Sequence, residues 1–451
     1  MNVLILNGSP KGEYSITLQT LKYLEKKFPE DTFEVLHVGK KIRALEKDFA
    51  PAIDAIEKAE ALVFSYPVYT FIAPCQLHRF IELLKEHQVD FTGKVATQVT
   101  TSKHFYDITA HRYIQDNCAD LGLPYIRGLS ADMDDLLTEK GRAEAESFWK
   151  HFEWQAEQGF FEPVPEPQRT SVGVPATVPE ETCEEKSGDV VIIADLRGGD
   201  TELQAMVDRF RARLPYATRV VDIRQYPFRG GCLGCFRCAS SGKCVYTDGF
   251  DSFLREKIQT AQAMVYAFRI SDHSMGARFK MYDDRQFCNG HRTVTIGMPV
   301  GYLISGNLSK EENLRTIIEG RAQVGSNILA GIATDERDTD AAIDRLVKQL
   351  TYSLEHKNTG PQNFLGIGGM KIFRDLIWQM QGLMREDHRF FKSHGQYDFP
   401  QKKRGRMLAM YLVGGLMGNP KLQKKMGNKM NEGMLMPYKK LFEQLDKESG
   451  K

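Results

Sequence analysis

Short apolar runs alternate along the chain with longer segments in which apolar residues recur every three or four positions. A short apolar run bounded by polar residues is typical of a buried strand, and the longer spacing is typical of an amphipathic helix. Strands separated by crossover helices form a parallel sheet, so the pattern predicts an α/β protein. The strands predicted in the first part of the chain cover residues 3–6, 33–36, 61–64, 94–99 and 123–127. Those predicted in the later part cover residues 190–194, 263–268, 293–297 and 328–333.

A proline-rich stretch interrupts this alternation, which then restarts. Residues 161–187 contain five prolines among Glu, Thr and Ser, a composition typical of a semi-rigid linker. We interpret the chain as two tandem copies of one doubly wound α/β domain, the second lengthened by an inserted cysteine segment. Two unrelated α/β domains are the alternative. The predicted parts are a first domain at 1–160, the linker at 161–187, a second domain at 188–358 and a helical C-terminal extension at 359–451.

The charge of the whole chain is balanced, but its distribution is not. The 451 residues are 42% hydrophobic and hold 60 Lys and Arg against 59 Asp and Glu. This balance argues against a nucleic-acid-binding protein and against a disordered chain. Residues 360–451 nevertheless hold 17 basic against 8 acidic residues and 10 of the 17 methionines. Three interpretations of this basic extension stay open. It could pack on the acidic body, attach to an anionic membrane surface, or cover a cofactor or a partner subunit.

The beginning of the chain leads directly into an apolar strand, without the basic and apolar regions of a signal sequence. No apolar run reaches the roughly 18 residues that a transmembrane helix needs. We therefore expect a cytoplasmic protein with no transmembrane segment. In that reducing compartment, clustered cysteines more often indicate metal or redox chemistry than disulfides.

The loop after the first predicted strand has the character of a phosphate site. Such loops lie at the carboxyl ends of strands, where doubly wound sheets bind ligands, and this one leads into a helix N-terminus that favours an anion. It lacks both the Gly-Lys-Ser/Thr of a triphosphate loop and the G-x-G-x-x-G of a dinucleotide loop, so a monophosphate suits it best. An ordinary strand–helix turn is the alternative. The candidate residues are Ser9, Pro10, Lys11, Ser15 and Thr17.

Two further loops are expected at the same edge of the sheet, because they follow the third and fourth predicted strands. Tyr69 could pack on a flat ring, and the hydroxyl groups of the later loop could bond the polar edge of that ring. Ordinary surface loops are the alternative. The candidate residues are Pro67, Val68, Tyr69, Thr101 and Ser102.

Together, these three loops resemble those of the flavodoxin-like NAD(P)H-dependent FMN reductases and quinone reductases. The resemblance rests on Gly-Ser-Pro-Lys at 8–11, on Tyr-Pro-Val-Tyr at 66–69 and on Thr-Thr-Ser at 100–102, and it covers about residues 1–150. It implies a flavodoxin-like fold and FMN, with the phosphate in the first loop and the isoalloxazine ring against the other two. NAD(P)H is then the implied electron donor, and the flavin would carry the chemistry.

The inserted segment of the second domain holds four cysteines within thirteen residues, at a C-x2-C-x2-C-x5-C spacing. Iron–sulfur clusters are held by such four-cysteine sets, whereas structural zinc more often takes two separated C-x2-C pairs. The spacing favours a [4Fe–4S] cluster, with zinc and redox or structural thiols as alternatives. The predicted ligands are Cys232, Cys235, Cys238 and Cys244.

The cysteine segment also resembles that of the iron–sulfur flavoproteins, over about residues 188–335. In that family FMN lies close to the cluster, often across a dimer interface, and electrons pass between them. The resemblance leaves a homodimer open for this chain. The loop after the first strand of the second domain departs from the pattern, because Asp195 and Asp200 would repel a phosphate, although Arg197 offsets part of that charge. Whether this domain binds a second FMN stays open.

These features predict a flavin-dependent oxidoreductase. Electrons would pass from NAD(P)H through FMN and the [4Fe–4S] cluster to a quinone, a flavin or a protein acceptor. Hydride transfer to a flavin needs no dedicated acid or base, so no catalytic residue is predicted. One alternative is an electron carrier without NAD(P)H activity of its own. Another is a second domain that serves as a redox-sensing or structural module.

Overall fold

The computed structural model describes residues 1–164, 173–180, 187–417 and 429–448. The chain divides into two units, residues 1–391 and residues 392–451. Parts of the predicted linker and of the basic extension, residues 165–172, 181–186, 418–428 and 449–451, lie outside the described residues. None of the helices in the described part of the chain combines the length and the apolar character needed to cross a membrane.

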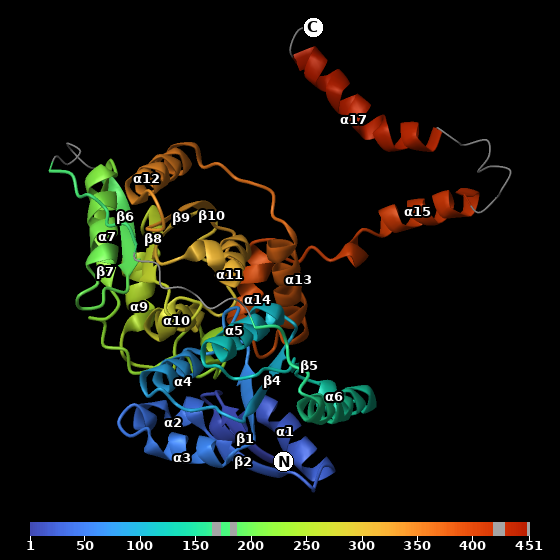
Figure 1. The fold of residues 1–451 in the computed structure, drawn as a ribbon. Coiled ribbons are helices and arrows are strands. Elements are labelled where there is room, and N and C mark those ends of the chain that lie inside the picture. Colours follow the sequence, from blue (N-terminus) through green and yellow to red (C-terminus); the bar gives the residue numbers. More distant parts are fainter. Residues whose placement is uncertain (165–172, 181–186, 418–428, 449–451) are drawn as a thin grey trace. The chain divides into compact units, whose positions relative to one another are not determined.

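The first half of the larger unit, residues 2–158, is a five-stranded parallel sheet with helices on both faces (Figure 1). The strand order is β2-β1-β3-β4-β5, the doubly wound order in which the chain reverses direction at β1 and β3. The strands are β1 (Asn2–Asn7), β2 (Thr32–Leu36), β3 (Ala61–Pro67), β4 (Val95–Ser102) and β5 (Leu129–Asp132). The helices are α1 (Ile16–Lys27), α2 (Val38–Leu45), α3 (Ala50–Lys58), α4 (Cys75–Glu86), α5 (Asp107–Asp120) and α6 (Glu139–Gln158).

The second half, residues 187–356, repeats this topology in the order β7-β6-β8-β9-β10. Both sheets are wholly parallel, as the alternation of strands and helices predicts. The strands are β6 (Ser187–Ala194), β7 (Tyr216–Asp222), β8 (Ala263–Arg269), β9 (Pro299–Ser305) and β10 (Ile328–Thr334). The helices are α7 (Thr201–Arg213), α8 (Arg237–Ser241), α9 (Phe250–Phe253), α10 (Gly276–Arg285), α11 (Glu312–Val324) and α12 (Thr339–His356).

Two strands differ from the sequence-based expectation. The alternating β-branched residues at 293–297 predict a strand, but this segment is a turn in which Val294 and Ile296 are exposed and Gly297 has a φ of +75°. The strand lies instead at β9, a continuous buried run of the kind that a sheet covered on both faces requires. The strand predicted at 123–127 contributes only a single bridge, between Ala96 and Tyr125, and the fifth strand follows at β5.

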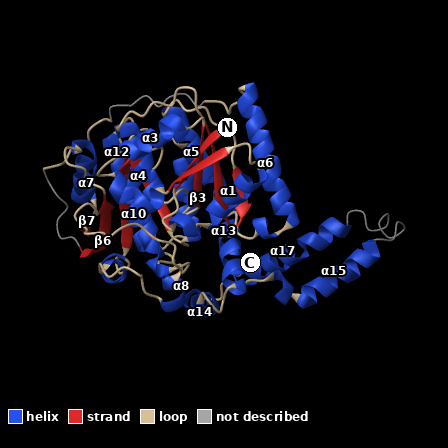
Figure 2. Ribbon diagram, turned by 90° about the horizontal axis from the view of Figure 1, so that it is seen from below, coloured by secondary structure: helices blue, strands red, loops and turns tan. Residues whose placement is uncertain are grey.

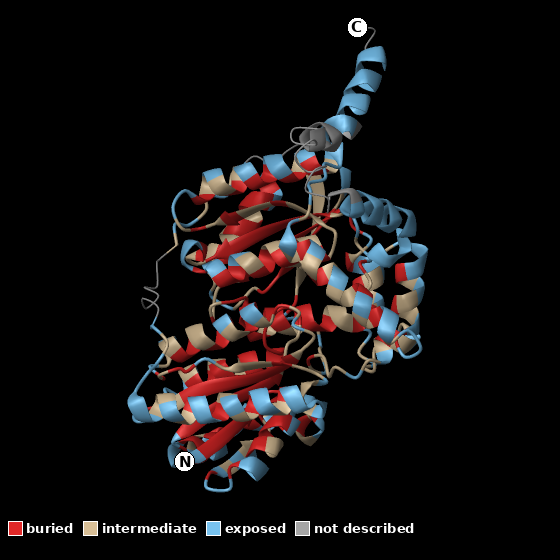
Figure 3. Cartoon of the chain, turned by 90° about the vertical axis from the view of Figure 1, so that its right-hand side faces the viewer, coloured by how far each residue is buried: buried red, intermediate tan, exposed pale blue. Residues whose placement is uncertain are grey.

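The two halves share one apolar core. One cluster of buried side chains joins the inner face of the first sheet, with Leu4 and Phe64, to the inner face of the second, with Ile193 and Tyr266. Helices α4 and α5 of the first half pack against α10 and α11 of the second half in this layer. Separate clusters cover the two outer faces. Figures 2 and 3 show the sheets enclosed by helices, with buried residues concentrated in the strands.

Two helices follow the second sheet within the larger unit. They are α13 (Phe364–Gln379), which packs against α11, and α14 (Arg385–Ser393), whose Asp387 and Phe391 are buried. The smaller unit contains α15 (Arg404–Met417) and α17 (Lys429–Glu448), and the side chains described there are mostly exposed. The predicted domain boundaries and the tandem origin of the two halves stay predictions.

Candidate functional site

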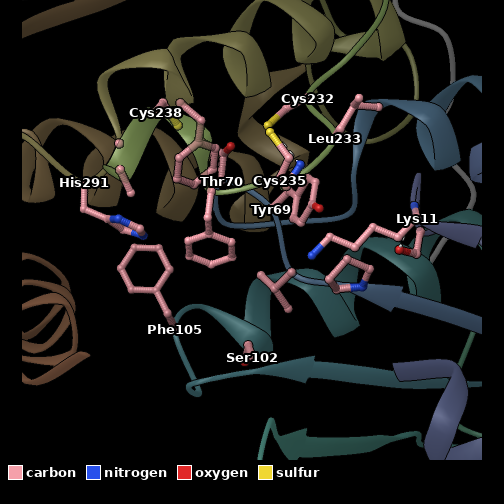
Figure 4. A pocket seen from close by; sticks show the side chains of 18 of the residues that line it. Lys11, Tyr69, Thr70, Ser102, Phe105, Cys232, Leu233, Cys235, Cys238 and His291 are labelled. Atoms are coloured by element: carbon pink, nitrogen blue, oxygen red, sulfur yellow. Dashed lines mark hydrogen bonds between the residues drawn. The ribbon is translucent and has the colours of Figure 1, made fainter. Parts of the chain in front are cut away.

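One pocket gathers the predicted loops of the first half and the predicted cysteines of the second. We call it the shared pocket. Figure 4 shows Cys232, Cys235 and Cys238 along one side of it and Ser102 and Phe105 along the opposite side. Of the predicted cofactor residues, all except Pro10 line it. They are Ser9, Lys11, Ser15, Thr17, Pro67, Val68, Tyr69, Thr101 and Ser102.

The first loop connects β1 to α1 and is held in place by its own side chains. Asn7 donates from Nδ2 to the carbonyl oxygen of Gly12 at 2.9 Å, and Gly12 adopts a φ of +58° that favours glycine. Ser15 caps α1 by accepting a hydrogen bond from the backbone N–H of Leu18 at 3.5 Å. The positive end of the α1 dipole therefore faces the pocket, as an anion-binding loop requires.

Lys11 adds a cation at this end of the pocket. Its ammonium lies 5.8 Å from the centre of the Phe236 ring, which belongs to the second half. No carboxylate in the described part of the chain forms an ion pair with it. The charge of Lys11 is therefore available to an anion in the pocket.

The loops after β3 and β4 form the middle of the pocket. The Thr101 Oγ1 is buried and has no hydrogen-bond partner among the described residues, although Thr101 lines the pocket. A buried hydroxyl without a partner is costly, and a polar ligand edge in the pocket would satisfy it. Thr70 and Phe71 have φ values of +45° and +77°, so the loop after Tyr69 is strained.

Tyr69 connects this loop to the cysteine segment. Burial, together with the nearby Cys232, raises the pKa of Tyr69 well above its usual range, so its hydroxyl stays protonated. The hydroxyl lies against Gly234, where any side chain would collide with it, and Gly234 also has a φ of +59°. Glycine at position 234 therefore permits the close approach of the two halves.

All four predicted cysteine ligands line the shared pocket. They lie on the segment between β7 and α9, and Cys235 is exposed whereas Cys232, Cys238 and Cys244 are half-buried. Burial raises the pKa of Cys232 well above its usual range and that of Cys238 to about 11. Within the described residues, no three His, Cys, Asp or Glu side chains come together as they would around a single metal ion.

The residues of a third wall of the pocket were not predicted, although a cover over a cofactor was one of the alternatives left open for the extension. This wall comes from α13 and from the segment after α10, where the Phe373 ring stacks on Phe105 at 4.4 Å between centres and contacts His291 at 4.8 Å. Asp387 of α14 fixes this wall, because its buried carboxylate lies 2.8 Å from the Nδ1 of His291 and 2.9 Å from Arg292. The apolar spacing of α13 predicts a buried helix face, but nothing in the sequence indicates which surface it covers.

The corresponding loop of the second half is closed by ion pairs. Asp195 is buried and pairs with Arg224 at 2.5 Å. Asp200 caps α7 through the N–H of Leu203 and pairs with Arg269 at 2.6 Å. Carboxylates therefore occupy the place where the first half presents hydroxyl groups and Lys11, and this loop does not suit a phosphate.

Comparison with solved structures finds similar chains at low sequence identity. An FMN-dependent NADH-azoreductase from Bacillus anthracis str. Ames Ancestor, solved with FMN, is 15% identical, with a TM-score of 0.26 and coverage of 35% of this chain and 98% of that one. An NAD(P)H:quinone oxidoreductase from Methanothermobacter marburgensis is 15% identical, with a TM-score of 0.30 and coverage of 39% and 100%. A flavoenzyme NAD(P)H:(acceptor) oxidoreductase from Paracoccus denitrificans is 17% identical, with a TM-score of 0.28 and coverage of 35% and 97%.

No curated protein sequence matches the chain. A family model does match, over the part of the chain that contains β1 to the start of β5 and therefore all three loops of the first half. That model is the one described as NADPH-dependent FMN reductase, and it covers residues 1–129. Residues 1–129 of this chain are therefore similar to the NADPH-dependent FMN reductases.

Proposed function

We propose that the chain is an NAD(P)H-dependent flavin oxidoreductase that binds FMN in the shared pocket and a [4Fe–4S] cluster on the four cysteines beside it. The observation that carries this proposal is the composition of the pocket wall, in which the loops of an FMN reductase face four thiols from the second half. When bound, FMN accepts a hydride and releases electrons singly, and the cluster transfers single electrons.

The residues of the first half would hold FMN at both of its ends. Lys11, the hydroxyl groups of the first loop and the N-terminus of α1 would bind the phosphate. The unpartnered Oγ1 of Thr101 would bond the polar edge of the ring system. Tyr69 and Phe105 would pack against the flat ring, and the cysteine segment and α13 would exclude water from it.

The cluster is proposed from the spacing of the four cysteines and from their common position on one wall of the pocket. Among the described residues, no three His, Cys, Asp or Glu side chains converge as a ligand set for one metal ion. The backbone N–H of Gly234 also points to the Sγ of Cys232 at 3.5 Å, and such donors favour the thiolate form that an iron ligand requires.

Anaerobic purification followed by flavin and iron analysis tests the proposal. We expect one FMN and about four iron atoms per chain, with flavin absorption peaks above a broad shoulder. Cys232→Ser should lose the iron and keep the FMN. The matched control is Cys118→Ser, which alters a buried cysteine outside the pocket and should keep both. Iron-free protein obtained under anaerobic conditions would contradict the cluster.

Steady-state oxidation of NADH and NADPH, with a quinone or ferricyanide as acceptor, tests the enzymatic part. An NAD(P)H-dependent oxidoreductase turns over under these conditions, whereas a pure electron carrier loaded with FMN does not. Turnover that survives Cys232→Ser unchanged with every acceptor would assign the second half a sensing or structural role instead.

A further inference from the structure

A second cavity lies between the two halves, next to the cysteine segment. Its lining comes from α2, α4 and α10 and from the loop that precedes Cys232. Its volume is about 640 Å³, against about 210 Å³ for the shared pocket. Leu233 and Tyr246 line both cavities, so one thin wall separates them. The size falls within the range of small-molecule sites, which lie preferentially between domains.

The lining of this cavity is strongly basic. It includes seven Lys and Arg side chains and three Glu side chains. All three glutamates, at positions 46, 82 and 86, bond to Arg79, at 3.1, 3.1 and 2.6 Å. Lys40 pairs with Glu13 at 2.8 Å, and Arg224 pairs with Asp195. All the carboxylates that line the cavity therefore pair with a single arginine, Arg79.

Three arginines of the lining remain without a carboxylate partner in the described part of the chain. Arg43 donates to the backbone carbonyl of Arg229, and Arg229 donates to the Oγ1 of Thr247 at 3.0 Å. Arg278 donates to the backbone carbonyls of residues 223 and 226 at 2.7 and 2.9 Å. Neutral acceptors satisfy their N–H groups only in part and leave their charges uncompensated.

The local field around Arg278 supports the same conclusion. Burial and the neighbouring charge of Arg224 lower the pKa of Arg278, which means that its positive charge is disfavoured in the cavity as it stands. An anion placed among these side chains would relieve that repulsion. Guanidinium groups also match phosphate oxygens in a two-pronged geometry, which makes arginine the preferred residue for phosphate recognition.

We propose that this interdomain cavity binds a phosphorylated anion of nucleotide size, with its phosphates held by Arg43, Arg229 and Arg278. Ile42, Leu233, Tyr246 and Met281 supply apolar lining on which a base could pack. Two kinds of ligand carry such phosphate groups. One is a nucleotide that takes no part in the reaction, and the other is a nicotinamide dinucleotide, which would bind through its pyrophosphate. The proposal does not depend on the presence of the cluster.

The occupant would lie against the segment that carries the cysteines. Gly230 and Gly231 line the cavity and directly precede Cys232, whose carbonyl accepts a hydrogen bond from the Nε2 of Gln76 at 3.4 Å. Gly231 is packed against the Sγ of Cys75, which leaves no room for a side chain there. A ligand in this cavity would therefore restrain the backbone beside the first cysteine.

Calorimetric titration of the full-length protein, saturated with FMN to fill the shared pocket, tests the site. The probes are adenosine 5′-diphosphate and inorganic pyrophosphate, at low and at high salt. We expect one binding event per chain that weakens as salt rises, because exposed charges are screened. The double variant Arg43→Gln/Arg229→Gln should weaken binding at least tenfold, and Arg345→Gln, an exposed arginine outside the cavity, should leave it unchanged.

Arg278→Met provides a second variant, and its circular dichroism spectrum reports whether it folds, since Arg278 holds several backbone carbonyls. Competition with NADP⁺ distinguishes the two kinds of ligand: displacement of the diphosphate points to the dinucleotide, and independent binding points to a separate nucleotide. Either result supports the cavity as an anion site. Failure of both probes to bind at low salt, or unchanged binding by the Arg43/Arg229 double variant, would overturn the proposal.

Discussion

The ammonium group of Lys280 donates a hydrogen bond to the backbone carbonyl oxygen of Tyr69, 3.0 Å away, so α10 of the second half fixes a pocket loop of the first. Lys280 is fully buried and pairs with Asp284. The Asp284 carboxylate in turn accepts hydrogen bonds from the Oγ1 of Thr70 at 3.0 Å and from the N–H of Cys75 at 2.8 Å. The strained loop conformation at Thr70 and Phe71 thus depends on an ion pair in the other half.

Lys280→Met should destabilise the protein strongly, because it leaves the buried Asp284 carboxylate without its cation. Breaking a buried pair in this way costs about 3–5 kcal/mol. Denaturant unfolding of the FMN-free protein measures the loss. The matched control is Lys85→Met, whose partly exposed pair with Asp120 should be worth less than about 1 kcal/mol. Similar small losses in both variants would mean that Lys280 does not hold the loop.

Thr101→Val should weaken FMN binding about fivefold, the equivalent of one ordinary hydrogen bond of about 1 kcal/mol. The variant removes the buried Oγ1 that no described residue satisfies and preserves the shape of the side chain. Fluorescence titration of FMN into the FMN-free protein measures the affinity. Thr97→Val is the control, because the Thr97 Oγ1 is also buried and unpartnered but lies on β4 outside the pocket. Equal affinities for all three proteins would exclude a bond from Thr101 to FMN.

His273 should make the stability of the protein fall as the pH rises above neutral. Burial opposes its charge, but ion pairs with Asp120 at 3.0 Å and Glu311 at 3.1 Å outweigh that effect and raise the pKa of His273 to about 10. A raised histidine pKa stabilises the folded state fully below about pH 6.5, and this contribution is lost between pH 6.5 and 10. The free energy of unfolding should therefore decrease by up to about 1.4 kcal/mol per pH unit in this window.

The variant His273→Gln isolates this contribution, because other titrating groups are common to both proteins. Asp116 nearby has its pKa raised to about 6 by burial, and measurements between pH 7 and 9.5 lie above its titration. Urea unfolding at several pH values gives the two slopes. Parallel slopes for the wild type and the variant would show that His273 is not charged in the folded protein.

Cluster-free protein should react with a thiol-alkylating reagent in the order of exposure of its cysteines. Cys235 is exposed and should be modified first, whereas Cys75, Cys118 and Cys288 are buried and should be protected in the folded state. Mass spectrometry of peptides after timed alkylation gives the rates. In protein that retains iron, Cys235 should be protected as well, because a ligated thiolate is not free to react. Rapid alkylation of Cys235 in iron-containing protein would remove it from the ligand set.

The sequence predicts the two sheets well because their strands are covered on both faces and so appear as continuous apolar runs. Residues 3–6 and 190–194 are such runs, and both lie within central strands. The pattern is misleading at residues 293–297, where β-branched residues alternate in a turn, because alternation records propensity and not burial. Local preference therefore identifies the doubly wound folds but not every strand.

For the candidate site, each loop is predictable by itself, but the arrangement of the two halves is not. Lys11 and Thr101 are brought to one sheet edge by topology, which the sequence predicts. Their position opposite Cys235 depends on packing between α4, α5, α10 and α11, which no local pattern records. The basic cavity cannot be predicted from the sequence for the same reason. Arg43 and Arg278 are far apart in the chain, and acidic residues elsewhere balance their charges in the overall composition.

All the walls of the shared pocket belong to one polypeptide, so dilution cannot separate them. Covalent connection sets the effective concentration of one half around the other, and this value does not change on dilution. Covalent connection also allows the two halves to differ in sequence, unlike the subunits of a homodimer. In a pair of identical subunits every substitution appears in both copies, whereas here the phosphate loop of one half and the carboxylate-filled loop of the other differ in sequence. The two halves can therefore differ in sequence within a single chain, so that a substitution in one half is not repeated in the other.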